Sequence, residues 1–482
     1  MKEAYLIIDI GTGTTRVAAV AEDGQILSMH KAATLSYTEE GIKGSCSFDP
    51  VGWWNTISEL VKNTAKDVCG YKIVAVTTCS LREGIVLFDD SGMPIVGYMN
   101  SDRRGLPFMD TLDWEFIWQE VGLYVSPIYS AVKMLGTRHL QPDRYSRVSR
   151  ITSISDYVGY CFTGNIVWER TQAMHSAVYD PVAGCWSDKM CAHFMLDKSM
   201  LPPIADSGSC LGSVKESTAH NLGLDSGVNY IVGTADTQAA LEGVGASEDE
   251  IVIVSGTTSP SVRIMNSFEK HPKSWTSPIA EKGKFMLEIN TFSSGINLQR
   301  FKNNILPRLS YEQLNEDAVR RGIPFSNLPK LFAVFSSGPH IDQPAYTGGF
   351  VMSSPIAIDI RPEDFYHALT LNTAMTIAMC LERHKEIKPL RNDYVIGCSN
   401  GFASETIANA VAGLSGLRVT LKDNWREATL YGMMILCLKA LKGKGPVHIP
   451  VKEYEPKCTQ KLMDYYQQWK DCRKKINSIE VN

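Results

Sequence analysis

Apolar runs alternate with turn residues at the start of the chain and predict three short strands. The run at 4–10 ends at a glycine- and threonine-rich turn over 11–15, resumes at 16–20, and resumes again at 25–29 after a turn. Apolar runs of this length between glycine-containing turns are typical of β-strands. The pattern predicts an antiparallel meander whose first corner is the Gly11–Thr15 turn.

A helical pattern follows the meander. Apolar residues recur with helical spacing over 53–65, and the apolar run at 73–76 predicts the next strand. Strands and helices then alternate through the first half of the chain. This alternation is typical of a layered α/β architecture.

The opening pattern returns near the middle of the chain. A strand at 251–255, a turn at 256–259 and a strand at 261–264 repeat the strand–turn–strand arrangement about 245 residues later. The match is short enough to be a coincidence. If it marks a duplication, we expect one domain over 1–245 and a second over 246–482.

The second half contains the elements that such a domain needs. We expect a helix-rich segment at 362–386, a strand at 393–396 with a turn over 397–401, an alanine-rich helix, and a terminal amphipathic helix at 457–475. These elements complete a second α/β domain.

Composition and charge restrict the kind of partner. The 482 residues are 44% hydrophobic and 21% charged, with a formal net charge of −4 and no basic run. A nucleic-acid or anionic-membrane surface would need such a run, so we expect a small-molecule partner. The twelve cysteines form no C-x-x-C and no zinc spacing with histidine, so we expect reduced, mostly buried thiols. Because no export signal or membrane span is evident, we predict a cytoplasmic location.

The turn at Gly11 is the first candidate site. Glycines let a backbone approach a phosphate closely, and amide and threonine donors bind it without adding charge. Asp9 ends the preceding strand, where a carboxylate can bind Mg²⁺ directly or through water. An ordinary tight turn is the alternative.

Asp236 is the second candidate. A buried strand ends at Gly233, and a helix begins at about Asp236. Aspartate commonly caps helices in this position. The functional alternative is a general base that takes a proton from a hydroxyl attacking a phosphate.

The third candidate is a pair of polar clusters, Arg82-Glu83 and Asp102 with Arg104. An adjacent donor and acceptor suit a vicinal diol, whose hydroxyls both give and accept hydrogen bonds. A solvated loop is the default interpretation of one charged pair. The second cluster, twenty residues on, weakens that interpretation.

Together and in this order, these segments resemble the FGGY family of carbohydrate kinases over nearly the whole chain. The resemblance implies two actin-like (ribonuclease H-like) α/β domains that form a cleft, and ATP-dependent phosphorylation of a small sugar or polyol with ATP and Mg²⁺. It assigns Asp236 as the catalytic base and Asp9 to the metal. It places these residues at nucleotide-contacting positions: Gly11, Thr12, Gly13, Thr14, Arg16, Gly256, Thr257, Thr258, Gly295, Gln299, Gly397 and Gly401.

Within the family, residues 79–87 and Asn100-x-Asp102-x-Arg104 look most like autoinducer-2 kinases. That resemblance implies a linear, hydrated five-carbon dihydroxydione as substrate, phosphorylated at its terminal hydroxyl. The substrate-binding residues it implies are Ser80, Arg82, Glu83, Asn100, Asp102, Arg104 and Gln238.

Some features depart from the family pattern and leave alternatives open. The adenosine motif, usually three glycines in a row, here has its glycines at 397 and 401, and Arg300 replaces a tryptophan. A xylulose-, ribulose- or glycerol-type kinase is one alternative. A sugar- or nucleotide-binding actin-like protein without catalysis is another, and homodimer formation is also open.

Overall fold

The computed structural model describes residues 2–124, 126–335 and 347–477. The chain divides into two compact units. Unit 1 comprises Met1–Gly243, Ser277–Phe285 and Thr429–Val447, and unit 2 comprises Val244–Thr276, Met286–Ala428 and His448–Asn482. Two segments from the second half of the sequence therefore belong to unit 1. The order of segments along the sequence does not reveal this exchange.

The main sheet of unit 1 has the strand order β13-β14-β5-β1-β2-β3. Strands β1 (Lys2–Ile10), β2 (Thr14–Ala21) and β3 (Ile26–Ala33) form the expected antiparallel meander. On the other side of β1, strands β5 (Tyr71–Ser80) and β14 (Asn229–Ile231) run parallel to it, and β13 (Cys210–Ser213) closes the sheet in the antiparallel direction.

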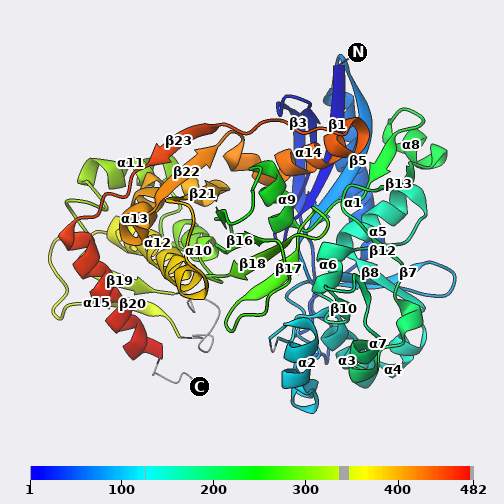
Figure 1. Cartoon of the computed structure of the whole chain (residues 1–482), viewed down its shortest axis with the longest axis horizontal. Coiled ribbons are helices and arrows are strands. Elements are labelled where there is room, and N and C mark those ends of the chain that lie inside the picture. Colours follow the sequence, from blue (N-terminus) through cyan, green and yellow to red (C-terminus); the bar gives the residue numbers. More distant parts are fainter. Residues whose placement is uncertain (1, 125, 336–346, 478–482) are drawn as a thin grey trace. The chain divides into compact units, whose positions relative to one another are not determined.

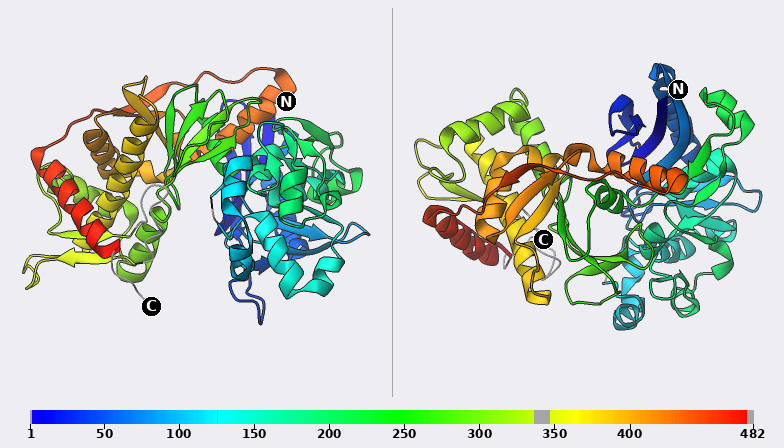
Figure 2. Two further views of the ribbon diagram at one scale, coloured as in Figure 1. Left: turned by 60° about the horizontal axis from the view of Figure 1, so that its bottom comes forward. Right: turned by 45° about the horizontal axis from the view of Figure 1, so that its top comes forward.

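Both faces of this sheet are covered, which explains the continuous apolar run of β1. Alternate side chains of a strand point to opposite faces. Leu6 and Ile8 pack in a cluster with α1 (Pro50–Asp67), whereas Tyr5 and Ile7 pack in another with α14 (Ala428–Lys442). Figures 1 and 2 show α14, in orange, beside the blue strands. A strand buried on both faces needs apolar residues at every position.

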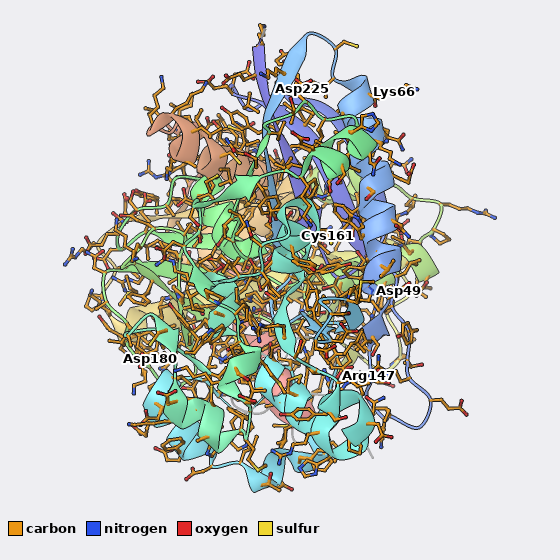
Figure 3. The ribbon with its side chains drawn as sticks, turned by 90° about the vertical axis from the view of Figure 1, so that its right-hand side faces the viewer. Asp49, Lys66, Arg147, Cys161, Asp180 and Asp225 are labelled. Atoms are coloured by element: carbon orange, nitrogen blue, oxygen red, sulfur yellow. The ribbon has the colours of Figure 1, made fainter. Side chains whose placement is uncertain are left out.

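Helix α1 is positioned by its first turn. Its N-cap is Asp49, whose side chain accepts a hydrogen bond from the amide of Val51 at 3.0 Å. The helix buries Trp53, Ile57 and Val61 against the sheet, at the i, i+4 and i+8 spacing of one face. Figure 3 shows the helix between the labelled residues Asp49 and Lys66.

The main sheet of unit 2 repeats the central arrangement of this sheet and, over the described residues, has seven strands where the unit 1 sheet has six. Strand β15 (Ile251–Val254) pairs with β16 (Ser261–Met265) in the antiparallel direction and with β21 (Tyr394–Cys398) in the parallel direction. The full order is β17-β18-β16-β15-β21-β22-β23. As in unit 1, a second parallel strand and a closing antiparallel strand follow, here β22 (Arg418–Lys422) and β23 (Pro450–Tyr454). This shared topology supports the interpretation of the Gly-Thr turns as a repeat.

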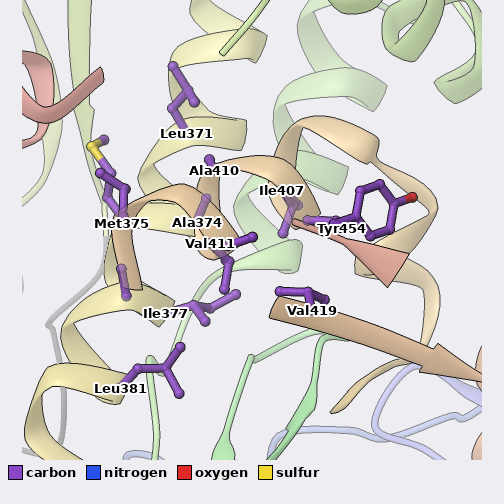
Figure 4. Close-up of a cluster of buried hydrophobic side chains, with 14 of the residues drawn as sticks. Leu371, Ala374, Met375, Ile377, Leu381, Ile407, Ala410, Val411, Val419 and Tyr454 are labelled. Atoms are coloured by element: carbon purple, nitrogen blue, oxygen red, sulfur yellow. The ribbon is translucent and has the colours of Figure 1, made fainter. Parts of the chain in front are cut away.

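The core of unit 2 lies between helices and this sheet. Helices α12 (Pro362–Ile387), α13 (Glu405–Ser415) and α15 (Gln460–Asn477) match the helices expected in this half. Figure 4 shows α12 and α13 contributing side chains to one cluster, together with Val419 of β22 and Tyr454 of β23. Fully burying such a side chain contributes roughly 1.5–3 kcal/mol.

The remaining elements complete the two units. In unit 1 they are β4 (Ser47–Phe48), β6 (Ile85–Phe88), β7 (Pro94–Tyr98), η1 (Leu106–Thr111), α2 (Trp114–Val121), α3 (Ser130–Leu140), α4 (Pro142–Ser146), β8 (Arg150–Ser153), α5 (Ile154–Thr163), β9 (Trp168–Glu169), α6 (Arg170–Met174), β10 (Tyr179–Asp180), β11 (Cys185–Trp186), α7 (Asp188–His193), η2 (Lys198–Met200), β12 (Ile204–Ala205), α8 (Glu216–Leu222) and α9 (Asp236–Gly243). In or adjoining unit 2 they are β17 (Trp275–Pro278), β18 (Phe285–Ile289), α10 (Gly295–Ile305), α11 (Tyr311–Arg321), β19 (Leu331–Val334), β20 (Gly349–Met352), η3 (Asn400–Ala403) and η4 (Trp425–Glu427).

The thiols and the helices bear on two expectations from composition. All twelve cysteines are free, and four of them (Cys69, Cys185, Cys210 and Cys458) are exposed, so burial is less general than expected. Among the described helices, none combines the length and the apolar character needed to cross a membrane.

Candidate active site

Three polar segments meet at one edge of the unit 1 sheet. Strands β1, β5 and β14 run parallel, so their carboxyl ends lie at the same edge. Ile10 pairs with Ser80, and Ser80 in turn forms a parallel bridge with Ala235. This register places Asp9, the corner after Ser80 and Asp236 beside one another, as a catalytic centre requires.

Asp236 lies half-buried at the start of α9. Its Oδ1 accepts a hydrogen bond from the amide of Thr237 at 2.6 Å. A capping side chain would reach the amide two or three residues further along the chain, so this contact does not support the capping interpretation. Burial raises the pKa of Asp236 to about 6; Arg82 opposes the shift and Asp9 adds to it. A carboxyl group with such a pKa is suited to accept a proton near neutral pH.

The Arg82-Glu83 corner is held rigidly and is not a solvated loop. Glu83 is buried and has a φ of 64°, in the left-handed region that costs a residue with a side chain about 1 kcal/mol or more. Lys133 is fully buried, and its Nζ donates to the carbonyl oxygen of Glu83 at 2.5 Å. His175 Nδ1 lies 2.8 Å from Glu83 Oε1. These two contacts stabilise the strained corner.

The charges at this corner affect one another. Burial disfavours the ionised form of Glu83, but His175, and then Arg82 and Lys133, outweigh that effect and lower the pKa of the carboxyl group. Burial lowers the pKa of Lys133 to about 8, although Asp102 and Glu83 oppose the shift. Glu83 is therefore ionised at neutral pH and can accept hydrogen bonds, whereas the pKa of Asp236 lies close to neutral pH.

A short buried segment that the sequence analysis did not single out connects these groups. In and just after α6, Thr171 Oγ1 accepts from the amide of Ala235 at 3.0 Å, and Gln172 Nε2 donates to Ser80 Oγ at 3.0 Å. His175, three residues after Gln172, contacts Glu83 as described. Residues 169–176 thus contact the corner after Ser80 and the residue that precedes Asp236. The available sequence signal was a dense run of polar residues, Glu169-Arg-Thr-Gln172, next to an apolar strand.

Asp102 and Arg104 are fully buried and bond to the protein itself. The Arg104 guanidinium donates to Asp102, Glu39 and Gln141, and it stacks 3.5 Å from the ring centroid of Tyr98. Asp102 Oδ2 also accepts from the amide of Cys46 at 2.7 Å. This geometry favours a structural role for Asp102 and Arg104 over direct contact with a ligand.

The other expected substrate residues differ in their surroundings. Ser80 is fully buried, and its hydroxyl is bonded to Gln172 and to the carbonyl of Leu81. Gln238 is buried and donates to the carbonyl of Pro278 at 3.3 Å, while its Oε1 has no hydrogen-bond partner among the described residues. Asn100 Nδ2 donates to Thr12 Oγ1 at 3.2 Å, which connects the expected substrate segment to the first turn.

The first turn is open to ligands. Thr12, Gly13 and Thr14 are exposed, and a hydrogen bond from the Gly11 amide to the Thr14 carbonyl at 3.0 Å closes the turn. Arg16 lies directly across the hairpin from Asp9, and its guanidinium contacts Asp9 Oδ2 at 2.5 Å. This arrangement orients one carboxylate oxygen beside a set of amide and hydroxyl donors.

In unit 2 the second turn packs against the start of α10. Gly256 and Thr257 are exposed and Thr258 is half-buried. The amide of Ile296 donates to the Thr257 carbonyl at 3.1 Å. A Cβ atom on Gly295 would lie 2.0 Å from the Gly256 carbonyl oxygen, so only glycine allows this approach.

The remaining residues with nucleotide assignments lie around the same turn. A Cβ on Gly401 would come within 2.0 Å of Ser255 Oγ, and one on Gly397 would come within 2.9 Å of Leu421 and Phe402. At Gly401 the close contacts include the Ser255 backbone, whereas at Gly397 they involve only the ends of side chains that can shift. Gln299 is exposed on α10.

Comparisons with known proteins agree on the family. The profile of the FGGY family of carbohydrate kinases, N-terminal domain, matches residues 4–243. The sugar kinase YoaC of Bacillus subtilis is 30% identical over 487 residues, covering 99% of this chain and 98% of that protein. An autoinducer-2 kinase of Salmonella paratyphi A is 24% identical over 458 residues, covering 89% of this chain and 85% of that protein.

Solved structures show the same fold. A xylulose kinase from Lactobacillus acidophilus superposes with a TM-score of 0.84 at 15% identity, with 99% of each chain covered. A Plasmodium falciparum glycerol kinase superposes with a TM-score of 0.82 at 16% identity, covering 100% of this chain and 99% of that one. The expected actin-like two-domain α/β fold is thereby confirmed. The chain is a sugar kinase and belongs to the FGGY family of carbohydrate kinases.

Proposed function

We propose that the protein transfers the γ-phosphoryl group of ATP to a hydroxyl of a small linear polyol or ketose, with Asp236 as the general base. The observation that carries this proposal is the pairing of two carboxylates with different titration behaviour at one sheet edge. Burial raises the pKa of Asp236 to about 6, while Glu83 is held ionised. Asp236 can accept a proton, and Glu83 can orient the acceptor, which is the substrate that receives the phosphoryl group.

The roles of the residues follow from this difference. Glu83 accepts, and Arg82 donates, hydrogen bonds to neighbouring hydroxyls of the acceptor. Asp236 then receives the proton of the attacking hydroxyl as its oxygen bonds to phosphorus, and ADP leaves. Phosphoryl transfer needs mainly such positioning and charge stabilisation. The donors of the turns at Gly11 and Gly256 are proposed to bind nucleotide phosphates.

Mg²⁺ is expected to enter with the nucleotide. Among the described residues no group of three or more acidic, histidine or cysteine side chains is arranged to hold a metal. Asp9 Oδ2 faces Arg16, whereas Oδ1 has, among the residues that the structure describes, only the weak donor Cys79 Sγ at 3.6 Å. One such oxygen fits a magnesium ion that keeps its waters and binds mostly phosphate. The metal would neutralise charge on the phosphates.

We favour an autoinducer-2-like acceptor, a linear hydrated dihydroxypentanedione. The Arg82-Glu83 corner and Asn100 support this proposal, and several relatives carry the name autoinducer-2 kinase. Xylulose-, ribulose- and glycerol-type acceptors remain the alternatives. The proposed direct contacts are Arg82, Glu83, Asn100 and Gln238, with Asp102, Arg104 and Ser80 forming the wall behind them. We also expect a cytoplasmic location.

A screen of acceptors tests this function. ADP release would be measured with ATP, Mg²⁺ and the autoinducer-2 precursor, glycerol, xylulose, ribulose, rhamnulose or gluconate. We expect release in proportion to one linear acceptor, with the dihydroxypentanedione fastest. Release that ignores every acceptor would indicate an actin-like ATPase and contradict the proposal. Sugar binding without nucleotide binding, measured by calorimetry, would indicate a sugar-binding protein without catalysis.

A further inference from the structure

His175 is a buried histidine with one occupied and one unoccupied ring nitrogen. Its side chain is 1% exposed, and Nδ1 lies 2.8 Å from Glu83 Oε1. Nε2 is buried and has no hydrogen-bond partner among the described residues. Leaving a buried polar atom without a partner is costly, so each such atom calls for a physical explanation.

A second buried polar atom without a partner lies on the adjacent segment. The amide of Ser130 donates to the carbonyl of His175 at 3.4 Å, and the Ser130 hydroxyl is likewise buried without a partner among the described residues. Both residues adjoin the Glu83 corner, since Lys133, one helical turn after Ser130, bonds to the Glu83 carbonyl. A ligand oxygen at this corner would satisfy buried atoms that the protein leaves unpaired.

The partner of Nδ1 decides what Nε2 can do. Glu83 is ionised and can only accept, so Nδ1 carries a proton. Nε2 is then an acceptor in the neutral ring and a donor in the protonated ring. A hydroxyl group, which both gives and accepts hydrogen bonds, can pair with Nε2 in either state.

We propose that His175 is a specificity-determining residue, whose Nε2 forms a hydrogen bond with a substrate hydroxyl adjacent to the one bound by Glu83. The proposal rests on the proposed function, because it needs the acceptor to lie at the Glu83 corner. It predicts selection for acceptors hydroxylated or hydrated at that carbon. An acceptor lacking this hydroxyl leaves Nε2 unpaired and is bound poorly.

Two substitutions test the roles of His175 Nδ1 and Nε2 separately. In His175→Asn the side-chain amide can replace Nδ1 and keep the Glu83 contact, but nothing replaces Nε2. In His175→Gln the amide reaches the Nε2 position and the Nδ1 contact is lost. His220→Asn, on the exposed helix α8, is the matched control.

The test compares the best acceptor from the screen with analogues that each lack one hydroxyl. For the analogue that lacks the hydroxyl bound by His175, we expect the wild-type kcat/KM to be about 10- to 100-fold lower than for the parent acceptor. His175→Asn should lower kcat/KM for the parent acceptor by a similar factor and leave that analogue within about twofold of wild type. His175→Gln should lower kcat/KM for both. Equal losses for parent and all analogues in His175→Asn, or no loss, would overturn the proposal.

A measurement on the wild-type protein covers the case in which the variants do not fold. The ¹⁵N resonance of His175 Nε2 should shift when the parent acceptor is added, and not with the discriminating analogue. Absence of a shift with the parent would overturn the proposal. If the wild-type protein phosphorylates no acceptor, the proposed function itself is wrong. If the wild-type enzyme is active but the expected results for His175 are not observed, only the His175 proposal is wrong.

Discussion

The chemistry proposed for this protein depends on how burial and charge give two carboxyl groups different pKa values. Asp236 and Glu83 lie at the same sheet edge, and both are affected by burial. Burial raises the pKa of Asp236, whereas His175 outweighs the effect of burial on Glu83 and keeps the pKa of that carboxyl group low. Two carboxylates with separated pKa values can take two roles, base and anchor. Sequence alone gave these residues no such difference.

The pH dependence of turnover follows from the pKa of Asp236. The base must be ionised to accept a proton, so kcat/KM for the acceptor should fall as the pH drops through about 6 and level off above it. Below the midpoint we expect about a tenfold loss per pH unit. Rate profiles across this range provide the measurement. The midpoint should persist in His175→Asn; its loss there would contradict the assignment to Asp236.

Arg104 illustrates what residue type cannot predict. Arginine is usually exposed, and the sequence predicts a substrate contact for Arg104. In the structure it is fully buried against Asp102, Glu39 and the ring of Tyr98. Asp102 and Tyr98 are close to Arg104 in sequence, but Glu39 is 65 residues away, and only the fold brings it to the guanidinium.

At the scale of elements, the sequence pattern predicts those elements whose conformation depends on residues close together in the chain. The meander, both Gly-Thr turns and the helices at 362–386 and 405–415 are determined by apolar periodicity and turn residues close in sequence. Segment 169–176 was missed because its role lies in contacts with Ser80, Glu83 and Ala235, 60 or more residues away. No periodicity records such pairings.

The approach of α10 to the second turn yields a prediction at this scale. Gly295→Ala places a Cβ within 2.0 Å of the Gly256 carbonyl, so the turn and the helix must separate. We expect the KM for ATP to rise about tenfold or more, as for a loss of roughly 1.4 kcal/mol of binding, with the acceptor KM little changed. Steady-state kinetics measure both. Gly349→Ala in β20 is the control, because a Cβ there has open space; an unchanged KM for ATP in Gly295→Ala would remove this turn from nucleotide binding.

On the scale of the whole molecule, the same central sheet arrangement occurs in both units. Each presents a strand–Gly-Thr turn–strand hairpin flanked by a parallel strand. The residues proposed to bind the acceptor and to take its proton belong to unit 1, and the residues proposed to bind adenosine belong to unit 2. Helix α14 could not be assigned from sequence, because it follows the unit 2 strands in the chain but packs in unit 1.

The most direct test of the account is transfer of labelled γ-phosphate from ATP to the best acceptor, compared between wild type and Asp236→Asn. We expect the phosphorylated acceptor from wild type and about 10²–10⁴-fold less from the variant, with acceptor binding retained. The variant should unfold at no lower temperature, because a carboxyl pKa raised by folding means that ionised Asp236 destabilises the fold above pH 4. Near-normal transfer by a folded Asp236→Asn protein would contradict the account.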